Sequence, residues 1–137
     1  MALWIQISAG SDKPIYTQIV EQISESIAKG ELAVGDRLPA VRKLAAELVI
    51  NPNTAARAYS VLEQARLVTT KTGSGTFVSA PELRSGDVAD INILAERMDT
   101  LITRGLNLGV EVKDLIAMFQ GRIDKFVNKR RKGKRKK

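Results

Sequence analysis

The sequence predicts a mainly α-helical fold with a small β-hairpin wing: an N-terminal winged helix-turn-helix followed by a C-terminal two-helix hairpin. Three observations lead to this prediction. Residues 38–59 have the pattern of a short amphipathic helix, a tight turn and a second helix. Residues 67–78 contain two β-prone runs around a glycine-rich turn, which is typical of a hairpin. Residues 87–108 and 111–128 carry two longer apolar stripes at helical spacing.

The chain begins with an alternating segment and a helix. Residues 3–7 alternate like a short strand or an extended arm, in which Trp4 is expected to anchor on the next helix or, alternatively, to stack on a base. A helix is predicted over residues 14–29, where Pro14 favours its start and Gly30 its end. Its apolar stripe consists of isoleucines at every fourth position, Ile15, Ile19, Ile23 and Ile27.

The helix-turn-helix has one apolar and one polar side. The inward positions at helical spacing are Val41, Leu44, Ala45 and Leu48 in the first helix and Ala55, Ala58, Tyr59 and Leu62 in the second. Asn51 is expected to cap the second helix, and Pro52 suits its first position. The outward residues Asn53, Thr54 and Arg57 are suited to base edges and phosphates. The alternative is an ordinary helical hairpin with a solvated polar face.

The glycine-rich hairpin follows the second helix directly, so the two together predict a winged helix. Gly73 and Gly75 supply positive φ angles and allow close approach of the backbone, and Lys71 is placed to reach phosphates or the minor groove. A nucleotide-binding loop would need a passage from strand to helix, whereas these glycines lie between two strands.

Residues 14–78 resemble the N-terminal domain of the GntR family of bacterial transcription regulators, and the Asn-Pro-Asn-Thr start of the second helix is similar to its small YtrA-like branch. The resemblance implies a DNA-binding domain over residues 1–80. The matching pattern comprises Pro14-Ile15-Tyr16, Gln18-Ile19, Gly30-Glu31-Leu32, Gly35, Leu38-Pro39, Arg42, Leu44-Ala45, Asn51, Thr54, Tyr59, Leu62-Glu63 and Gly73-Ser74-Gly75-Thr76-Phe77-Val78. The positions that it implies as DNA contacts are Arg42, Asn51, Asn53, Thr54, Arg57, Lys71, Gly73 and Gly75.

The chain departs from the family pattern at several positions. Ala40 replaces the usual serine, so the first helix of the pair lacks a hydroxyl cap worth about 1 kcal/mol. Val49 and Arg66 stand where helix ends normally carry glycine, so either these helices end differently or the residues adopt a strained left-handed conformation at roughly 1–2 kcal/mol. Pro52 and Ala56 replace arginines that are common in other branches, which leaves more of the base reading to Arg57.

Residues 81–128 are expected to form a helical hairpin for dimerisation. Two helices are too small to bury their apolar faces alone, so they must pack on something else. Packing on a second chain, which the YtrA-like resemblance implies, would supply two recognition helices for an inverted-repeat site. The alternative is a monomer whose hairpin folds back on its own winged helix. The residues expected at the dimer contact are Met98, Leu101, Ile102, Leu115, Ile116 and Phe119.

The positive charge is confined to one end of the chain. The net charge is +7, but residues 128–137 hold eight of the 22 basic residues and no acidic one. The remaining residues balance to −1, so the winged-helix prediction does not depend on a basic composition. We expect residues 129–137 to be a basic, disordered tail. It could hold DNA without reading sequence, contact RNA or anionic lipid, or act only as a solubilising end.

The rest of the composition excludes several kinds of chemistry. The chain has neither cysteine nor histidine, which removes thiolate and imidazole catalysis and zinc-thiolate sites, and we expect no metal and no cofactor. No apolar run is long enough to span a membrane. The length leaves no room for a large effector domain, and any small-molecule effector is unknown. We therefore predict that the protein is not an enzyme. We predict a cytoplasmic, homodimeric regulator of transcription that binds double-stranded DNA. That it represses transcription is implied by the family resemblance alone.

Two other classes of protein remain as alternatives. In a nonspecific nucleic-acid-binding or architectural protein, the basic tail would dominate binding and the helix-turn-helix would serve as scaffold. A helical protein-interaction adaptor would have no affinity for DNA. The operator sequence and the regulated genes lie beyond what the sequence predicts.

Overall fold

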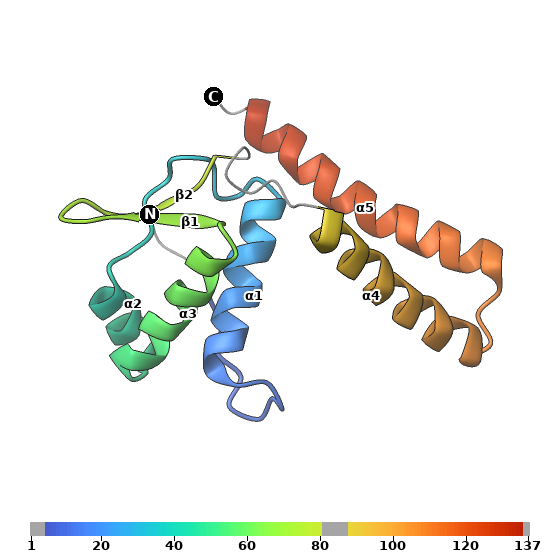
Figure 1. Ribbon diagram of the computed structural model, residues 1–137, viewed down its shortest axis with the longest axis horizontal. Helices are drawn as coiled ribbons and strands as arrows, with labels where there is room; N and C mark the ends of the chain where they lie inside the picture. Colours follow the sequence, from blue (N-terminus) through green and yellow to red (C-terminus); the bar gives the residue numbers. More distant parts are fainter. Residues whose placement is uncertain (1–4, 81–87, 136–137) are drawn as a thin grey trace.

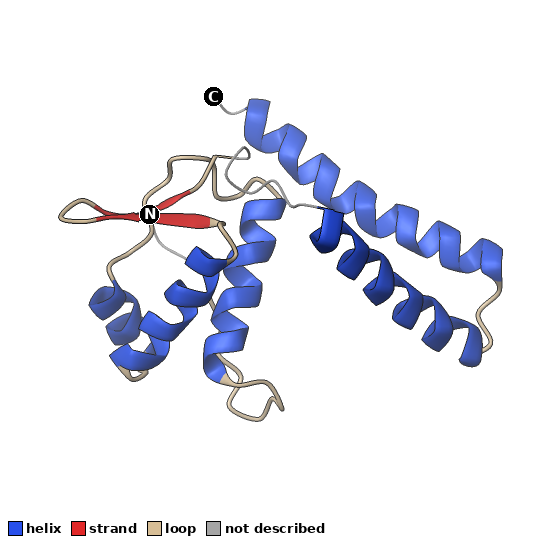
Figure 2. Ribbon diagram, viewed as in Figure 1, coloured by secondary structure: helices blue, strands red, loops and turns tan. Residues whose placement is uncertain are grey.

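The computed structural model describes residues 5–80 and 88–135 of the 137-residue chain. Its elements are, in order, α1 (Ile15–Ala28), α2 (Val41–Leu48), α3 (Pro52–Gln64), β1 (Val68–Lys71), β2 (Gly75–Val78), α4 (Val88–Asn107) and α5 (Val112–Arg135). Helices α1 to α3 and the hairpin form one unit, and α4 and α5 extend from it along the long axis (Figures 1 and 2). The predicted mainly helical fold with one antiparallel hairpin is confirmed.

The core of the winged helix lies between the first three helices and the hairpin. Helix α1 contributes the predicted isoleucine stripe, of which three members are buried and Ile15 is half-buried. All four residues predicted for the inner face of α3 are buried. The complete buried apolar set is Ile19, Ile23, Ile27, Leu32, Leu38, Leu44, Ala45, Ala55, Ala58, Tyr59, Leu62, Val68 and Val78.

Two helices end on residues other than glycine in the left-handed conformation. Val49 after α2 has φ 55° and Arg66 after α3 has φ 62°. In each case the next residue closes the helix end, since Ile50 N donates to Ala45 O at 3.0 Å and Leu67 N donates to Leu62 O at 3.0 Å. Both helix ends are therefore closed around a left-handed residue, and the backbone carries the strain that the sequence predicted as one of two alternatives.

The wing is more than a two-stranded hairpin. Val68 pairs with Val78 and Lys71 with Gly75 in an antiparallel register. The segment before α2 joins the outer side of β2, where Leu38 N donates to Thr76 O at 2.8 Å and Val78 N donates to Asp36 O at 2.9 Å. The sequence analysis did not predict this third segment. It connects the start of α2 to the wing through backbone hydrogen bonds.

The N-terminal arm lies against α1 through glutamine side chains. The Gln22 amide accepts from Gln6 N at 3.0 Å and donates to Gln6 O at 2.8 Å. The Gln18 amide accepts from Ser8 N at 2.8 Å and donates to Ser8 O at 3.1 Å. The arm is therefore attached by hydrogen bonds of the kind that a neighbouring strand would make. Trp4, predicted as an anchor, lies outside the described residues.

Helices α4 and α5 form a hairpin with close contact at one point. A Cβ placed on Gly105 would come within 2.6 Å of Leu115 Cδ2, so glycine at this position lets Leu115 pack against α4. Gly105 therefore has a packing reason that offsets its low helix propensity. The other end of α5 approaches the winged helix, where Lys29 Nζ lies 5.2 Å from the centroid of the Phe126 ring.

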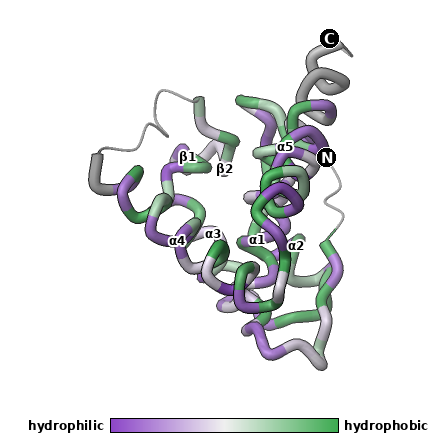
Figure 3. Tube along the Cα trace, turned by 90° about the vertical axis from the view of Figure 1, so that its right-hand side faces the viewer, coloured by the Kyte–Doolittle hydropathy of each residue, from purple (hydrophilic) through white to green (hydrophobic). Residues whose placement is uncertain are grey.

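The apolar faces of this hairpin are largely exposed, and hydrophobic and hydrophilic residues alternate along both helices (Figure 3). Leu101 and Ile116 are each 65% exposed. Helix α5 also continues to Arg135, whereas we expected a helix end at residue 128 and a disordered segment from residue 129. The physical reason is that lysine and arginine are good helix formers and their charge interacts favourably with a helix C-terminus.

Candidate nucleic-acid interface

The start of α3 presents polar side chains on an exposed surface. The side-chain oxygen of Asn51 accepts a hydrogen bond from Asn53 N at 2.8 Å, which confirms the predicted cap. Because the cap occupies the oxygen, the amide NH₂ of Asn51 remains as a pair of donors. Asn53 is exposed and Thr54 is half-buried. This end of α3 can therefore donate hydrogen bonds to phosphates and present a second amide to base edges.

Arg57 is held in place by an aromatic ring from another helix. Its Cζ atom lies 4.0 Å from the centroid of the Tyr16 ring on α1, and its Nη2 donates to Tyr16 Oη at 3.4 Å. Arg57 is nevertheless exposed, so its guanidinium is oriented without being removed from solvent. The sequence analysis placed Arg57 outward but did not predict this stacking, which joins residues 41 positions apart.

Tyr59 fixes α3 against the segment that leads into α2. Its hydroxyl donates to the carbonyl oxygen of Pro39 at 2.7 Å. Burial, with a smaller contribution from the negative charge of Glu47, raises the pKa of Tyr59 above its ordinary value. The phenol therefore stays protonated and keeps its donor over the ordinary pH range.

The wing carries one lysine and two glycines with distinct requirements. Lys71 Nζ lies 5.4 Å from the centroid of the Phe77 ring and the residue is exposed. Gly73 has φ 81°, and no atom lies within 4 Å of the place that a Cβ would occupy, so only the backbone conformation of the turn requires glycine there. Gly75 has φ 125°, and a Cβ there would lie 2.8 Å from Arg37 Nε.

The candidate residues come from one end of the molecule. Helices α2 and α3 and the wing lie at the left in Figure 1, and the α4–α5 hairpin lies at the right. Arg42 on α2 is exposed and belongs to the first group. The sequence analysis missed Arg37, because its approach to the wing depends on a pairing between Arg37 and Phe77 that no local periodicity reveals.

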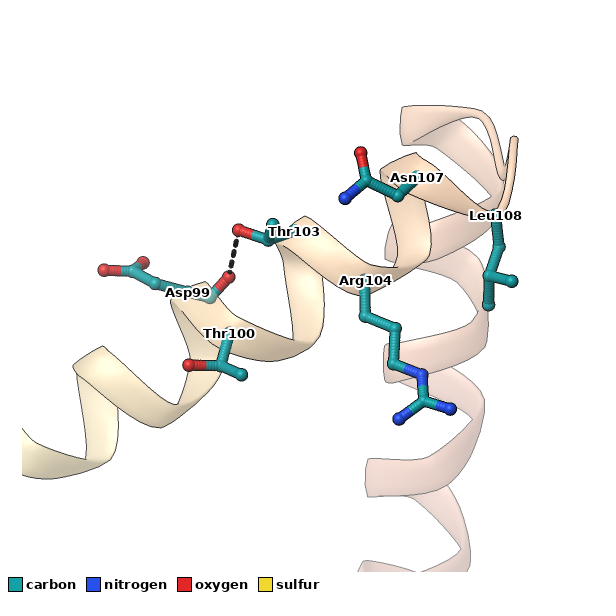
Figure 4. Close-up of a pocket in the computed structure, with 6 residues that line it drawn as sticks. All are labelled: Asp99, Thr100, Thr103, Arg104, Asn107 and Leu108. Carbon is teal, nitrogen blue, oxygen red and sulfur yellow. Dashed lines mark hydrogen bonds between the residues drawn. The ribbon is translucent and has the colours of Figure 1, made fainter.

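A second surface feature is a hollow of about 530 Å³ along α4. Its lining side chains come from α4 and from Leu108 directly after it, and they point in different directions (Figure 4). The hydroxyls of Thr100 and Thr103 donate to carbonyl oxygens of their own helix at 3.3 and 2.9 Å. Nothing in this hollow converges on a ligand. The lining residues are Asp99, Thr100, Thr103, Arg104, Asn107 and Leu108.

Two further kinds of site are absent from residues 5–80 and 88–135. This part of the chain contains no cluster of three or more acidic side chains that could hold a metal ion. It also contains no helix that is both long enough and apolar enough to cross a membrane.

A helix-turn-helix with a polar, capped second helix and an adjoining wing defines a winged-helix DNA-binding protein. Residues 15–78 match the model of the "Bacterial regulatory proteins, gntR family". The HTH-type transcriptional repressor YtrA of Bacillus subtilis is 37% identical over 111 residues, which cover 81% of this chain and 85% of that protein. The chain belongs to the GntR family and is a DNA-binding transcription regulator rather than an enzyme.

Solved structures agree with this assignment. A transcriptional antiterminator from Listeria monocytogenes EGD-e superposes with a TM-score of 0.79 at 28% identity, over 88% of this chain and 91% of that chain. YtrA from Sulfolobus acidocaldarius, a GntR-family transcription factor, superposes with a TM-score of 0.57 at 34% identity, over 75% of this chain and 97% of that chain. The resemblance to the YtrA-like branch that the sequence indicated is therefore confirmed.

Proposed function

We propose that this regulator acts as a homodimer that binds an inverted-repeat DNA site and represses transcription in the cytoplasm. The observation that carries the dimer is the exposed apolar face of the α4–α5 hairpin. Repression is supported by the relative YtrA of Bacillus subtilis, which is described as a transcriptional repressor. A two-fold dimer supplies two copies of α3 and therefore favours a site with two-fold symmetry.

Each candidate residue has a proposed role on DNA. Asn53 and Arg57 would read base edges from the exposed start of α3, and Thr54 and the amide donors of Asn51 would bind there as well. Arg42 and Lys71 are exposed cations on α2 and on the wing, suited to phosphates. In the wing, Gly73 and Gly75 would let the backbone approach DNA closely.

The dimer contact is proposed for the exposed part of the predicted set. Leu101, Ile102, Ile116 and Phe119 are between 48% and 65% exposed, and Met98 is 37% exposed. Leu115 is half-buried against Gly105, so it supports the hairpin within one chain. An apolar surface of this extent is unusual for a monomer and is typical of an interface. These side chains are exposed, which disfavours the alternative of a hairpin folded onto its own winged helix.

Assembly can be tested by adding one charge to this face. Ile116→Lys places an ammonium group in the proposed contact, where it would have no partner. The matched control is Ala117→Lys. Position 117 lies on the side of α5 opposite to Phe119 of the proposed contact, so this variant adds the same charge to the polar side of the helix. In sedimentation at micromolar concentration, we expect a dimer for the unmodified protein and Ala117→Lys, and a monomer for Ile116→Lys. A monomeric unmodified protein would refute the proposal.

DNA recognition can be tested by selecting bound duplexes from a random pool. A regulator of the proposed kind enriches a motif with two-fold symmetry, whose half-sites are separated by about one helical turn. A single unpaired motif would contradict the dimeric mode. Enrichment of no motif would favour the nonspecific, architectural alternative that the basic tail suggests, because charge alone carries no sequence information.

A further inference from the structure

We propose that Arg37 is a further DNA-contacting residue: its side chain lies beside Gly75 of the wing and binds a backbone phosphate, and Lys43 adds positive charge to the same hollow. This inference rests on the proposed DNA-binding mode and adds a site that the sequence pattern did not indicate. The site is a hollow of about 280 Å³ formed by the segment before α2 and by α2 itself, lined by Arg37, Leu38, Pro39, Ala40 and Lys43.

The backbone around Arg37 is fixed by the wing. Arg37 pairs with Phe77 in an antiparallel bridge, and the next residue donates a hydrogen bond from Leu38 N to Thr76 O at 2.8 Å. The origin of the Arg37 side chain therefore has a defined position beside β2. A long side chain that starts from a fixed backbone loses less freedom on binding a phosphate than one on a mobile loop.

The side chain of Arg37 occupies the space beside Gly75 in which a Cβ would stand. A Cβ at this position would lie 2.8 Å from Arg37 Nε, 3.3 Å from Nη2 and 3.4 Å from Cζ. Any residue other than glycine would displace the side chain of Arg37. Glycine at position 75 therefore permits this contact, and its φ of 125° also favours glycine. At Gly73, by contrast, no atom lies within 4 Å of the place that a Cβ would occupy. The contact with Arg37 is therefore specific to position 75.

The hollow has a net positive charge that is not neutralised within the protein. Arg37 and Lys43 are its two ionisable lining residues, and both are exposed. No ion pair of either residue occurs in the described parts of the chain. The neighbouring carboxylate of Asp36 is engaged elsewhere, since it accepts a hydrogen bond from Ala33 N at 2.8 Å.

The occupant favoured by these observations is a phosphate of duplex DNA. Two exposed cations hold a small free anion weakly, because water screens their charge. A polyanion bound at α2, α3 and the wing would instead bring its backbone past this hollow, and the pair would then add to many other contacts. Arginine is well suited to this role, since its planar fork can bind two phosphate oxygens together.

The test measures duplex affinity as a function of salt for Arg37→Gln, with Arg104→Gln as a matched control. Arg104 is exposed on α4, at the other end of the molecule, and both variants lose one positive charge. One phosphate contact contributes a slope of about −0.9 to log affinity against log salt. The proposed dimer loses two such contacts, so between about 50 and 200 mM salt the unmodified protein should lose about 12-fold more affinity than Arg37→Gln. Arg104→Gln should retain the original slope.

The contact between Arg37 and Gly75 is tested by combining two variants. Gly75→Ala should weaken binding in the unmodified background by displacing Arg37 and by straining the backbone. In the Arg37→Gln background it should weaken binding less, since only the backbone effect remains. Equal losses of duplex affinity in both backgrounds would refute the contact between Arg37 and Gly75. Thermal melting of each variant verifies that the fold is retained.

Other outcomes separate this proposal from the proposed function. An unchanged salt slope for Arg37→Gln, with normal specific binding by the unmodified protein, would overturn the phosphate site alone. A changed base preference in Arg37→Gln would also overturn it, because a phosphate contact weakens all sequences alike. If inorganic phosphate alone binds at this site, and Arg37→Gln does not change duplex binding, the occupant is a free anion. This result would overturn the DNA assignment. Failure of the unmodified protein to prefer any duplex would instead refute the proposed function.

Discussion

The ring of Tyr16 is expected to set the position of Arg57 before DNA arrives. The substitution Tyr16→Leu keeps an apolar side chain against the core but removes the aromatic face that lies 4.0 Å from the guanidinium carbon. A cation–π contact at an exposed site is worth about 0.5–1 kcal/mol. If DNA binding uses the arginine in its stacked position, loss of this ordering should weaken binding to the preferred site by about two- to fivefold.

Two related variants separate the contributions of the Tyr16 ring, its hydroxyl and Arg57 to DNA affinity. Tyr16→Phe keeps the ring and removes only the hydroxyl that accepts the 3.4 Å hydrogen bond, so it should lower affinity less than twofold, an effect of roughly 0.4 kcal/mol or less. Arg57→Ala should lower specific affinity by about 1–3 kcal/mol and leave binding to random duplexes largely intact. In the Arg57→Ala background, Tyr16→Leu should have no further effect.

The assay is fluorescence anisotropy with the selected duplex and a random duplex, together with thermal unfolding of each variant. The reasoning is refuted if Tyr16→Leu tightens specific binding, because the stack would then compete with DNA for the arginine. It is equally refuted if Tyr16→Leu lowers affinity by the same factor whether or not Arg57 is present. Equal losses on both duplexes in Arg57→Ala would remove its base-reading role.

Three further predictions concern the turn, the phosphate contacts and the basic end of the chain. Val49→Gly should raise the free energy of unfolding by about 0.5–1 kcal/mol in denaturant titrations, since Val49 is 89% exposed and its left-handed strain exceeds the entropy cost of glycine; lower stability would contradict this. Arg42→Ala and Lys71→Ala should each weaken all duplexes alike and make the salt dependence shallower, and an altered selected motif would refute a phosphate role. Removing residues 128–137 should also reduce the salt dependence but leave the selected motif unchanged, whereas loss of all sequence preference would favour the architectural alternative.

The parts of the interface that follow from local sequence could be predicted. The buried face of α3 follows from the helical spacing of Ala55, Ala58, Tyr59 and Leu62, and the capping role of Asn51 follows from its position before proline. The left-handed Val49 and Arg66 could be anticipated because they occupy positions where the family normally has glycine. In each case, the determining interactions span only a few residues of chain.

The remaining features depend on contacts between distant segments. The stacking of Arg57 on Tyr16 requires the packing of α3 on α1, and the contact of Arg37 with Gly75 requires the pairing of residues 35–38 with β2. No periodicity within either segment encodes such a pairing. The continuation of α5 to Arg135 was missed for a different reason, because a run of like charges was given more weight than the helix propensity of its residues.

The attachment of the N-terminal arm has a consequence for how sequences of this kind can diverge. The amides of Gln18 and Gln22 bind backbone atoms of residues 6 and 8, and Gln18 also donates to Lys13 O, so the side chains at positions 6 and 8 contribute nothing to those bonds. Mutational drift at Gln6 and Ser8 should therefore be nearly neutral for the docking of the arm. Drift at positions 18 and 22 should not be, since even glutamate could accept from the arm but not donate to it. Selection on these hydrogen bonds is thus expected to act through residues of α1.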